Sequence, residues 1–182
     1  VRRCCTIQNE EELRRMLQGL FTPRKPPAPV PAQGLLGMMD PSLIAVSVSC
    51  ATWQEAVRRA YQPLALREAI TEEYIQHTIA TMEIAGPYVV IAPHVALLHT
   101  EARHGARQPA LSLTVFETPV VFSHPENDPV KYAFALSVPQ GTPSHLTAMA
   151  GLLRLLEDPG FYAECDTQDR ERIWASVCGH LD

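Results

Sequence analysis

The sequence has few of the features that mark several common classes of protein. Lys and Arg together number 15 against 20 Asp and Glu among 182 residues, a net charge of −5, and they are scattered rather than clustered. Binding a nucleic-acid backbone needs a basic stripe, so we expect no direct contact with nucleic acid. No apolar run approaches the ~20 residues of a membrane helix, and the first residues lack a signal peptide's apolar segment. We therefore expect no membrane insertion and a cytoplasmic location.

Cysteine is scarce and irregularly spaced. The cysteines are Cys4, Cys5, Cys50, Cys165 and Cys178, an odd number that includes no C-x-x-C pair. This argues against a disulfide framework and against a zinc knuckle, so we expect reduced thiols with mostly packing roles. A hydrophobic content of 46% is enough for one domain with a sizeable core plus some additional sequence.

Proline, in contrast, is concentrated in one segment. Residues 22–31 contain five prolines in ten positions, which excludes helix and sheet and favours an extended spacer. We therefore predict a linker over residues 22–37 and a folded domain over 38–182. Residues 1–21 contain a short amphipathic helix, either the tail of an upstream domain or a terminal helix that packs on this one. The chain begins with Val1 rather than methionine, so we expect a piece of a longer protein.

Apolar spacing predicts helices and strands that alternate along the remaining chain. Runs of β-branched and aromatic residues predict the strands, and caps with helical spacing predict the helices. The predicted strands cover residues 42–49, 110–116, 120–122 and 132–138, and the predicted helices cover 52–63, 71–84, 143–157, a short stretch around 161, and 167–178. This alternation indicates an α/β fold, a mixed sheet sandwiched by helices, with the first strand at an edge.

Residues 86–104 bring histidines to the end of a buried, β-rich run. Val, Ile and Tyr favour a pleated backbone, and Pro93 interrupts it because proline cannot donate to a strand ladder. We predict a strand, a break and a second short strand, with His99 at its exit. A neutral imidazole suits phosphoryl carriage because it is nucleophilic near neutral pH and forms a labile N–P bond. The other interpretation of His99 is a core histidine at a strand end.

Three motifs give the chain a resemblance to a known family. Residues 88–100, YVVIAPHVALLHT, resemble the active-site signature of the type 2 enzyme IIA (EIIA) domains of the bacterial sugar phosphotransferase system, the mannitol–fructose–ascorbate class. Residues 124–131, HPENDPVK, are similar to the family's NPENDPVK strand start, and residues 144–146 to its SHL helix start. The resemblance covers roughly residues 40–180. It implies the EIIA α/β sandwich, with the phosphoryl acceptor at His99.

The resemblance also implies a second site histidine, His145. Thr142 as cap and Pro143 as first helical residue would surround His145 with free backbone N–H groups, which favour phosphate. Donors aimed at a transferring phosphoryl group stabilise it without a metal. Ser144 and Thr142 are candidate hydroxyl donors to the same oxygens, or caps only. The other interpretation of His145 is a solvated residue at a helix start.

As the resemblance implies, we expect a phosphotransferase component that accepts a phosphoryl group from the phosphocarrier protein HPr on His99. It would pass the group to a cysteine of a IIB component for sugar uptake, with no cofactor and no metal. An apolar rim around His99 is the expected docking surface. The sugar is not predicted, because a IIA domain contacts proteins rather than sugar, and neither is the oligomeric state.

Several residues depart from the family pattern. His94 stands in place of a glycine, Leu98 in place of the proline before the acceptor, and Glu101 shortly after it. Histidine disfavours backbone angles that glycine permits, so we expect an altered turn after Pro93. Glu101 brings negative charge toward an incoming phosphate, and relatives often carry an arginine near Thr81. These changes predict weaker phosphate stabilisation.

Two alternatives come from other classes of protein. Such domains also end multidomain transcription regulators, as regulatory relatives controlled by phosphorylation; the linker, the missing start methionine and the altered site favour this interpretation. Sequence upstream of Val1 would separate it from a transport component. The other alternative is a zinc-dependent hydrolase, with ligands among His94, His99, His104, His124 and Glu101. Their spacings do not reproduce a helical H-E-x-x-H pair, and strand periodicity places His94 and His99 on opposite faces.

Overall fold

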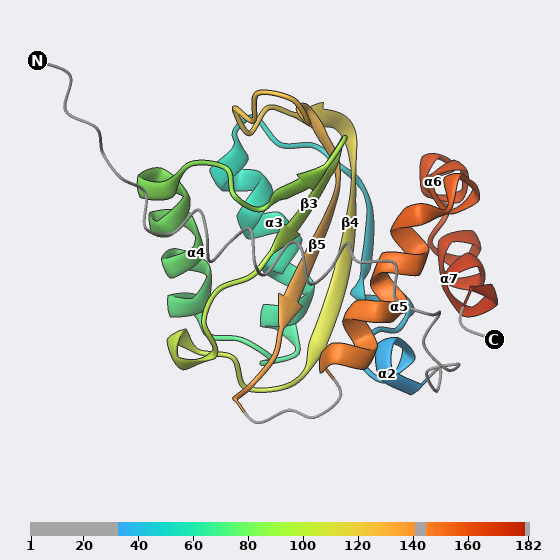
Figure 1. Cartoon of the computed structure of the whole chain (residues 1–182), viewed down its shortest axis with the longest axis horizontal. Helices are drawn as coiled ribbons and strands as arrows, with labels where there is room; N and C mark the ends of the chain where they lie inside the picture. Colours follow the sequence, from blue (N-terminus) through green and yellow to red (C-terminus); the bar gives the residue numbers. More distant parts are fainter. Residues whose placement is uncertain (1–32, 141–144, 181–182) are drawn as a thin grey trace, which may run out of the picture. The chain divides into compact units, whose positions relative to one another are not determined.

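A five-stranded mixed sheet lies at the centre of the structure, a computed structural model that describes residues 33–140 and 145–180 (Figure 1). The strand order is β1-β4-β5-β3-β2. The strands are β1 (Ile44–Val48), β2 (Val90–Ala92), β3 (Val95–Leu98), β4 (Ala110–Val120) and β5 (Val130–Ser137). β1 runs parallel to β4 and β3 parallel to β5, while β4–β5 and β2–β3 are antiparallel pairs. The predicted mixed sheet with its first strand at an edge is confirmed.

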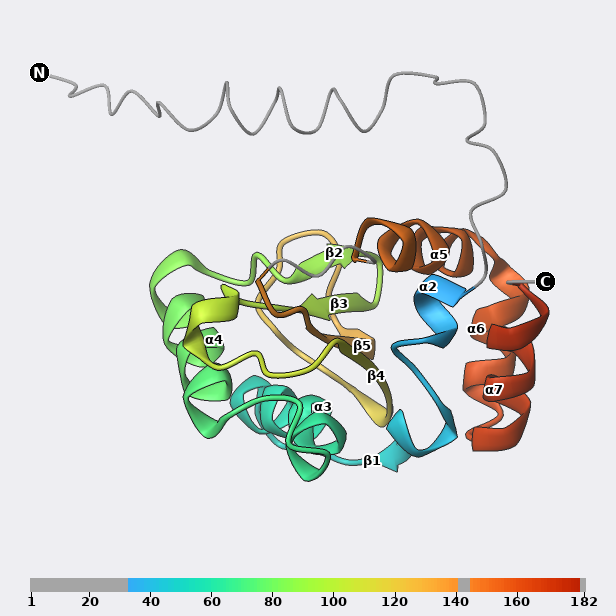
Figure 2. The ribbon, with the colours of Figure 1, turned by 90° about the horizontal axis from the view of Figure 1, so that it is seen from below.

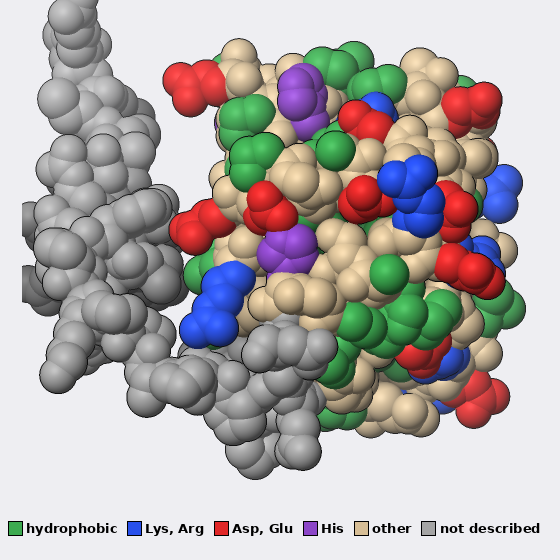
Figure 3. All heavy atoms as spheres, turned by 90° about the vertical axis from the view of Figure 1, so that its right-hand side faces the viewer, with side chains coloured by type: hydrophobic (Ala, Val, Ile, Leu, Met, Phe, Trp, Pro, Cys, Tyr) green, Lys and Arg blue, Asp and Glu red, His purple; other side chains and the backbone are tan. Residues whose placement is uncertain are grey.

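Helices cover both faces of this sheet, as Figure 2 shows, so the predicted sandwich is also confirmed. One face carries α3 (Trp53–Leu66) and α4 (Glu72–Ala85). The other carries α2 (Gln33–Leu36), α5 (His145–Glu157), α6 (Pro159–Asp166) and α7 (Arg170–Gly179). The surface over α6 and α7 intersperses acidic, basic and apolar side chains (Figure 3). None of the helices described here is long and apolar enough to cross a membrane.

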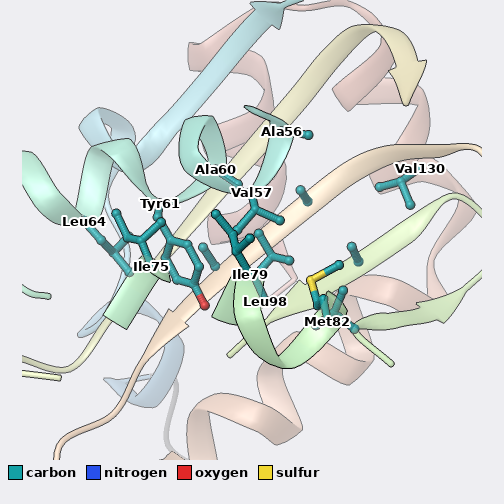
Figure 4. Close-up of a cluster of buried hydrophobic side chains, with 14 of the residues drawn as sticks. Ala56, Val57, Ala60, Tyr61, Leu64, Ile75, Ile79, Met82, Leu98 and Val130 are labelled. Carbon is teal, nitrogen blue, oxygen red and sulfur yellow. The ribbon is translucent and has the colours of Figure 1, made fainter. Parts of the chain in front are cut away.

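Each face of the sheet has its own apolar core, because side chains alternate along a strand. In β3, Leu98 packs in the core under α3 and α4, whereas Leu97 packs in the core under α5. Figure 4 shows the core under α3 and α4, in which the side chains of Tyr61 of α3, Ile79 of α4 and Leu98 of β3 belong to one buried cluster. Burial of a leucine stabilises the fold by roughly 1.5–3 kcal/mol. The strand that leads to His99 is therefore anchored on both faces.

The α4 helix begins after Thr71 and ends at Gly86, close to the predicted limits. Glu72 and Glu73 occupy its first turn, where carboxylates complement the positive end of the helix dipole. Gly86 ends it with a φ of +80°, a left-handed angle that glycine adopts without a Cβ clash. The Thr71 hydroxyl does not cap the helix but donates to the carbonyl of His104, at 3.3 Å. This contact joins the start of α4 to η2 (Ala102–His104), the 3-10 turn that follows His99.

The α3 helix and the β4 strand are longer than predicted. The sequence predicted a helix end near Pro63, but α3 continues to Leu66. Proline lacks an N–H and removes one helical hydrogen bond. Leu64, the next residue, is fully buried, and its burial offsets that loss. The two strands predicted between residues 110 and 122 form one strand, β4, with an irregularity in its pairing to β5.

The N-terminal boundary of the domain also differs from the expected one. The short helix α2 lies within residues 22–37, where the sequence predicted linker. Leu35 is only 1% exposed and belongs to the core on the α5 side. Four residues are too few to show a helical period, so composition dominated the prediction. The helix predicted in residues 1–21 and the proline-rich segment at 22–31 lie outside the described residues.

Candidate functional site

His99 is the first residue after β3 and its side chain is exposed. The structure thus has a strand, a turn and a second strand, with the histidine at the exit, as the sequence predicted. β3 and β5 are parallel, with Leu98 opposite Ala135, so both strands end at the same edge of the sheet. A histidine at this position is held by a rigid strand and is open to solvent.

Two contacts fix the orientation of the His99 ring. Its Nδ1 lies 3.0 Å from the carbonyl oxygen of Leu97. A carbonyl oxygen only accepts, so Nδ1 carries the hydrogen and Nε2 keeps an unshared electron pair. The ring of Tyr88 meets the imidazole edge to face, at 5.9 Å between centroids and 83° between planes. Nε2 is therefore the ring nitrogen that keeps a free electron pair.

The peptide bond after His99 is held by two tyrosine hydroxyls. Tyr88 Oη donates to the carbonyl oxygen of His99, at 3.2 Å. The N–H of Thr100 donates to Tyr74 Oη, at 3.3 Å. Tyr74 Oη also lies 3.0 Å from the carbonyl oxygens of Thr100 and Leu136, and it donates to one of them at a time. Burial is the main cause that raises the pKa of both tyrosines, so both hydroxyls keep their hydrogen at neutral pH.

Two further histidines, His77 and His104, lie beside this site. His77 was not predicted from the sequence, and His104 was named only as a candidate zinc ligand. His77 Nδ1 lies 2.8 Å from the Thr100 hydroxyl and 3.4 Å from the Thr81 hydroxyl. Its ring stacks on that of His104, with 3.4 Å between centroids and 15° between planes. One signal was available, because Tyr74, His77 and Thr81 are three and four residues apart and share a helix face. The partner across the stack is 27 positions away and follows only from the fold.

A neighbouring cation partly neutralises the negative charge of Glu101. Its carboxylate forms an ion pair with Arg103 Nε, at 3.0 Å. Both side chains are largely in solvent, so the pair adds little stability, about 0–1 kcal/mol. Its relevance is electrostatic: the cation two residues away offsets the negative charge that Glu101 brings near His99.

The turn between β2 and β3 contains His94, which replaces a glycine of the family pattern. His94 adopts a φ of +66°, in the left-handed region. Its backbone N–H donates to the carbonyl of Asn127 at 2.9 Å, and its Nδ1 donates to the carbonyl of Pro129 at 2.7 Å. In this tight turn, His94 is therefore a strained residue, and hydrogen bonds from its side chain and its backbone hold it in place.

The histidines of the zinc alternative do not converge. His94 and His124 both bond to the loop 124–129, at the start of β3, whereas His99 lies at its end and His104 stacks on His77. Among residues 33–140 and 145–180, no group of three or more His, Cys, Asp or Glu side chains is arranged to hold a metal ion.

In the sequence, the remaining predicted site residues come shortly before α5 or begin it. Thr142 and Ser144 fall outside the described residues, and so does the side chain of His145. His145 is the first residue of α5, and the helix start predicted at Pro143 lies outside the described residues. The chain that leads to it leaves β5, whose end lies at the same sheet edge as His99. That the rings of His145 and His99 share one phosphate stays a prediction.

A sequence model of the family described as phosphoenolpyruvate-dependent sugar phosphotransferase system, EIIA 2, matches residues 38–177 of this chain. The chain belongs to this EIIA family. It is 30% identical over 107 residues to the ascorbate-specific phosphotransferase system EIIA component of Salmonella paratyphi A, which covers 59% of this chain and 70% of that protein. The residues matched by the family model, 38–177, include β3, the His99 region and the motifs at residues 124–131 and 144–146. The family resemblance inferred from the sequence is confirmed.

Solved structures agree with this assignment. A candidate phosphotransferase system IIA domain from Streptococcus pyogenes M1 GAS is 30% identical, with a TM-score of 0.70 over 83% of this chain and 96% of that one. The IIA subunit in the complex of enzyme IIA and phosphorylated enzyme IIB for mannitol from Escherichia coli is 17% identical, with a TM-score of 0.66 over 78% of this chain and 97% of that one. The second likeness shows the fold alone. As an EIIA domain, the chain is a phosphocarrier component of a sugar phosphotransferase system.

Proposed function

We propose that His99 Nε2 accepts a phosphoryl group from phosphorylated HPr and passes it to a IIB component. The observation that carries this proposal is the geometry of one side chain. His99 is exposed at the end of a buried strand, and its Nδ1–H is bonded to the Leu97 carbonyl. Nε2 therefore has an unshared electron pair and open access, the two requirements of a nucleophile.

The transfer involves one bond that forms and one that breaks. The Nε2 electron pair attacks phosphorus, and the bond between phosphorus and the donor's histidine nitrogen breaks, with its electron pair returning to the donor. The ring of His99 keeps its Nδ1 hydrogen, so the positive charge that develops on the imidazole faces the Leu97 carbonyl oxygen at 3.0 Å. That oxygen stabilises the phosphorylated form. In the second transfer a cysteine thiolate of the IIB component attacks phosphorus, and the electron pair returns to Nε2.

Charge stabilisation of the phosphoryl oxygens is assigned to the start of α5. Strand alternation supports this, since Leu97 packs on the α5 side while Leu98 and Thr100 lie on the α3 and α4 side. By the same alternation we expect His99, between them, to leave the strand toward α5. The N-terminal amides of a helix of 13 residues favour an anion. We assign His145 as the second donor, with Thr142 and Ser144 as further candidates.

The partners follow from the same exposure. Tyr88 is 39% exposed and contacts the His99 ring, so it supplies the apolar rim that a docking protein would cover. HPr and the IIB component must both reach Nε2, and a sheet edge gives each of them access in turn. The solved complex of the mannitol IIA protein with phosphorylated IIB shows a neighbour of this fold engaging such a partner.

Phosphorylation by purified components tests the acceptor. Incubation with enzyme I, HPr and phosphoenolpyruvate should add one acid-labile phosphate per chain. The His99→Ala variant should take up none, because it lacks the nucleophile. His94→Ala and His104→Ala should still become labelled, since neither ring is the acceptor. Label that persists in His99→Ala would refute the assignment.

A further inference from the structure

The regular hydrogen bonding of β3 ends just before the acceptor. The last contact on the β2 side is the bond from the Leu97 N–H to the Val89 carbonyl, at 2.8 Å. On the β5 side, pairing ends with Leu98 opposite Ala135. The peptide bond between His99 and Thr100 lies beyond both. An unpaired peptide at a strand end has two soft torsion angles on each side, which would leave the acceptor ring poorly oriented.

Two tyrosine hydroxyls take the place of the missing strand partners. Tyr88, two residues before β2, donates to the carbonyl of His99. Tyr74 of α4 accepts the N–H of Thr100 and also contacts the carbonyl of Leu136, the residue after Ala135 in β5. The carbonyl and the N–H of one peptide bond are thus both satisfied, each by a different tyrosine. This peptide cannot rotate without breaking both hydrogen bonds.

The two tyrosines have different surroundings. Tyr74 is 1% exposed and packs edge to face on Tyr61, at 5.6 Å, so its hydroxyl is held by the core. Tyr88 is 39% exposed and also contacts the imidazole of His99 with its ring. Its hydroxyl and its ring restrain two parts of the same residue. Tyr88 is therefore the member that can be changed with little effect on the core.

We propose that Tyr88 and Tyr74 are positioning residues for the acceptor, a tyrosine clamp on the 99–100 peptide. The proposal rests on the proposed function of His99. The clamp fixes the direction in which the imidazole leaves the backbone, and this keeps Nδ1 on the Leu97 carbonyl and Nε2 toward the partner. The hydroxyls of both tyrosines bond to the backbone of residues 99 and 100 and not to the imidazole. A displacement of the reacting group by about 1 Å can lower a transfer rate by on the order of 100-fold.

Kinetics of the intact chain test the clamp. In Tyr88→Phe the ring contact stays and the hydroxyl is lost, so the transfer rate at saturating phosphorylated HPr should fall by about 10- to 100-fold. Tyr88→Leu loses both contacts and should fall further. The concentration of donor at half-saturation should stay the same in Tyr88→Phe. Tyr162→Phe is the matched control, because Tyr162 Oη donates to a carbonyl, that of Leu156, at 2.9 Å, outside this site.

A second measurement does not depend on phosphoryl transfer. Nitrogen-15 NMR of the ring should show the Nδ1–H tautomer of His99 in the unmodified protein and in Tyr162→Phe. Tyr88→Phe and Tyr88→Leu should show a mixture of tautomers. If the wild-type chain takes no phosphate, the proposed function fails while this readout still tests the clamp.

Two results would overturn the clamp. One is an unchanged tautomer and an unchanged saturated rate in both Tyr88 variants. The other is a Tyr88→Phe variant that changes only the half-saturation concentration, which would make the hydroxyl a docking contact rather than a positioning one.

Discussion

His94 shows how one residue can stay in an unfavourable backbone conformation. A residue other than glycine in the left-handed region costs about 1–2 kcal/mol. His94 is held there by its bonds to Asn127 and Pro129, and its own carbonyl accepts the N–H groups of Lys131 and Tyr132. The side-chain bond to Pro129 is one that glycine cannot make. Histidine thus offsets part of its own strain.

Substitution of His94 should separate strain from bonding. His94→Ala keeps the strained angle and loses the Nδ1 bond, so it should lower the free energy of unfolding by about 1 kcal/mol. His94→Gly also loses the bond but relieves the strain, so it should be more stable than His94→Ala by about 0.5–1 kcal/mol. Urea unfolding of the two variants measures the difference. Equal stability of Ala and Gly would show that the turn is not strained.

At the scale of elements, an ion pair joins the start of α6 to the end of α7. Asp158 caps α6, and its carboxylate contacts Nε2 of His180, the residue after α7. His180 Nδ1 donates to the carbonyl of Ser176 at 2.7 Å, so both ring nitrogens act as donors, which requires the imidazolium form. The bond to the Ser176 carbonyl is the main cause that raises the pKa of His180; burial opposes the rise, and the bond to Asp158 adds to it. The bond from the Gly160 N–H, followed by that from His180, lowers the pKa of Asp158.

These shifts predict a pH window for the stability of the α6–α7 pair. A raised histidine pKa contributes stability that is complete below about 6.5 and disappears as pH rises through the pKa of the folded state. A lowered aspartate pKa contributes stability above about 3.9 that disappears as pH falls through its folded value. Because of this ion pair, the midpoint of thermal unfolding should be lower at pH 8.5 than at pH 5.5. The His180→Gln variant should have a smaller difference between the two pH values; a difference as large as in the wild type would exclude the pair as its source.

Elements with complete local signals were predictable from the sequence. α4 has acidic residues at its start and Gly86 at its end, and the turn near Pro93 follows from the missing donor. α2 was missed because its stability comes from Leu35 in the core and not from a local pattern. In the site, the position of His99 at a strand exit followed from the β-rich run and its break at Pro93. Its contacts with Tyr88, and the His77–His104 stack, depend on side chains brought together only by the fold.

The carboxylate of Asp166 links α6 to the central sheet. Asp166 accepts hydrogen bonds from Lys131, at 2.7 Å, and from the hydroxyl of Tyr132, at 2.6 Å, both on β5. Burial acts to raise the pKa of Asp166, but these two bonds lower it overall. The neighbouring Cys165 is fully buried, and its burial raises the pKa of the thiol to about 12. Cys165 therefore reports whether this helical layer stays closed.

Thiol labelling should distinguish Cys165 from Cys50, which is partly exposed. At pH 8 in the folded chain, iodoacetamide should modify Cys165 at least about 100-fold more slowly than Cys50, because α6 must first open. In 8 M urea the two rates should become similar. Peptide mass spectrometry gives the rate at each cysteine. Equal rates in the folded chain would mean that α6 opens far more readily than its contacts imply.

The two outer strands of the sheet affect how the domain behaves at high concentration. β2 has three residues, and β1 has five with a break in register where Ser47 takes a φ of +54°. The N–H of Ser47 is occupied by the side-chain oxygen of Gln168, at 2.6 Å. Short, irregular edges with occupied donors are poor templates for an additional strand. Edge-to-edge pairing between sheets of two copies of this domain is therefore unfavourable.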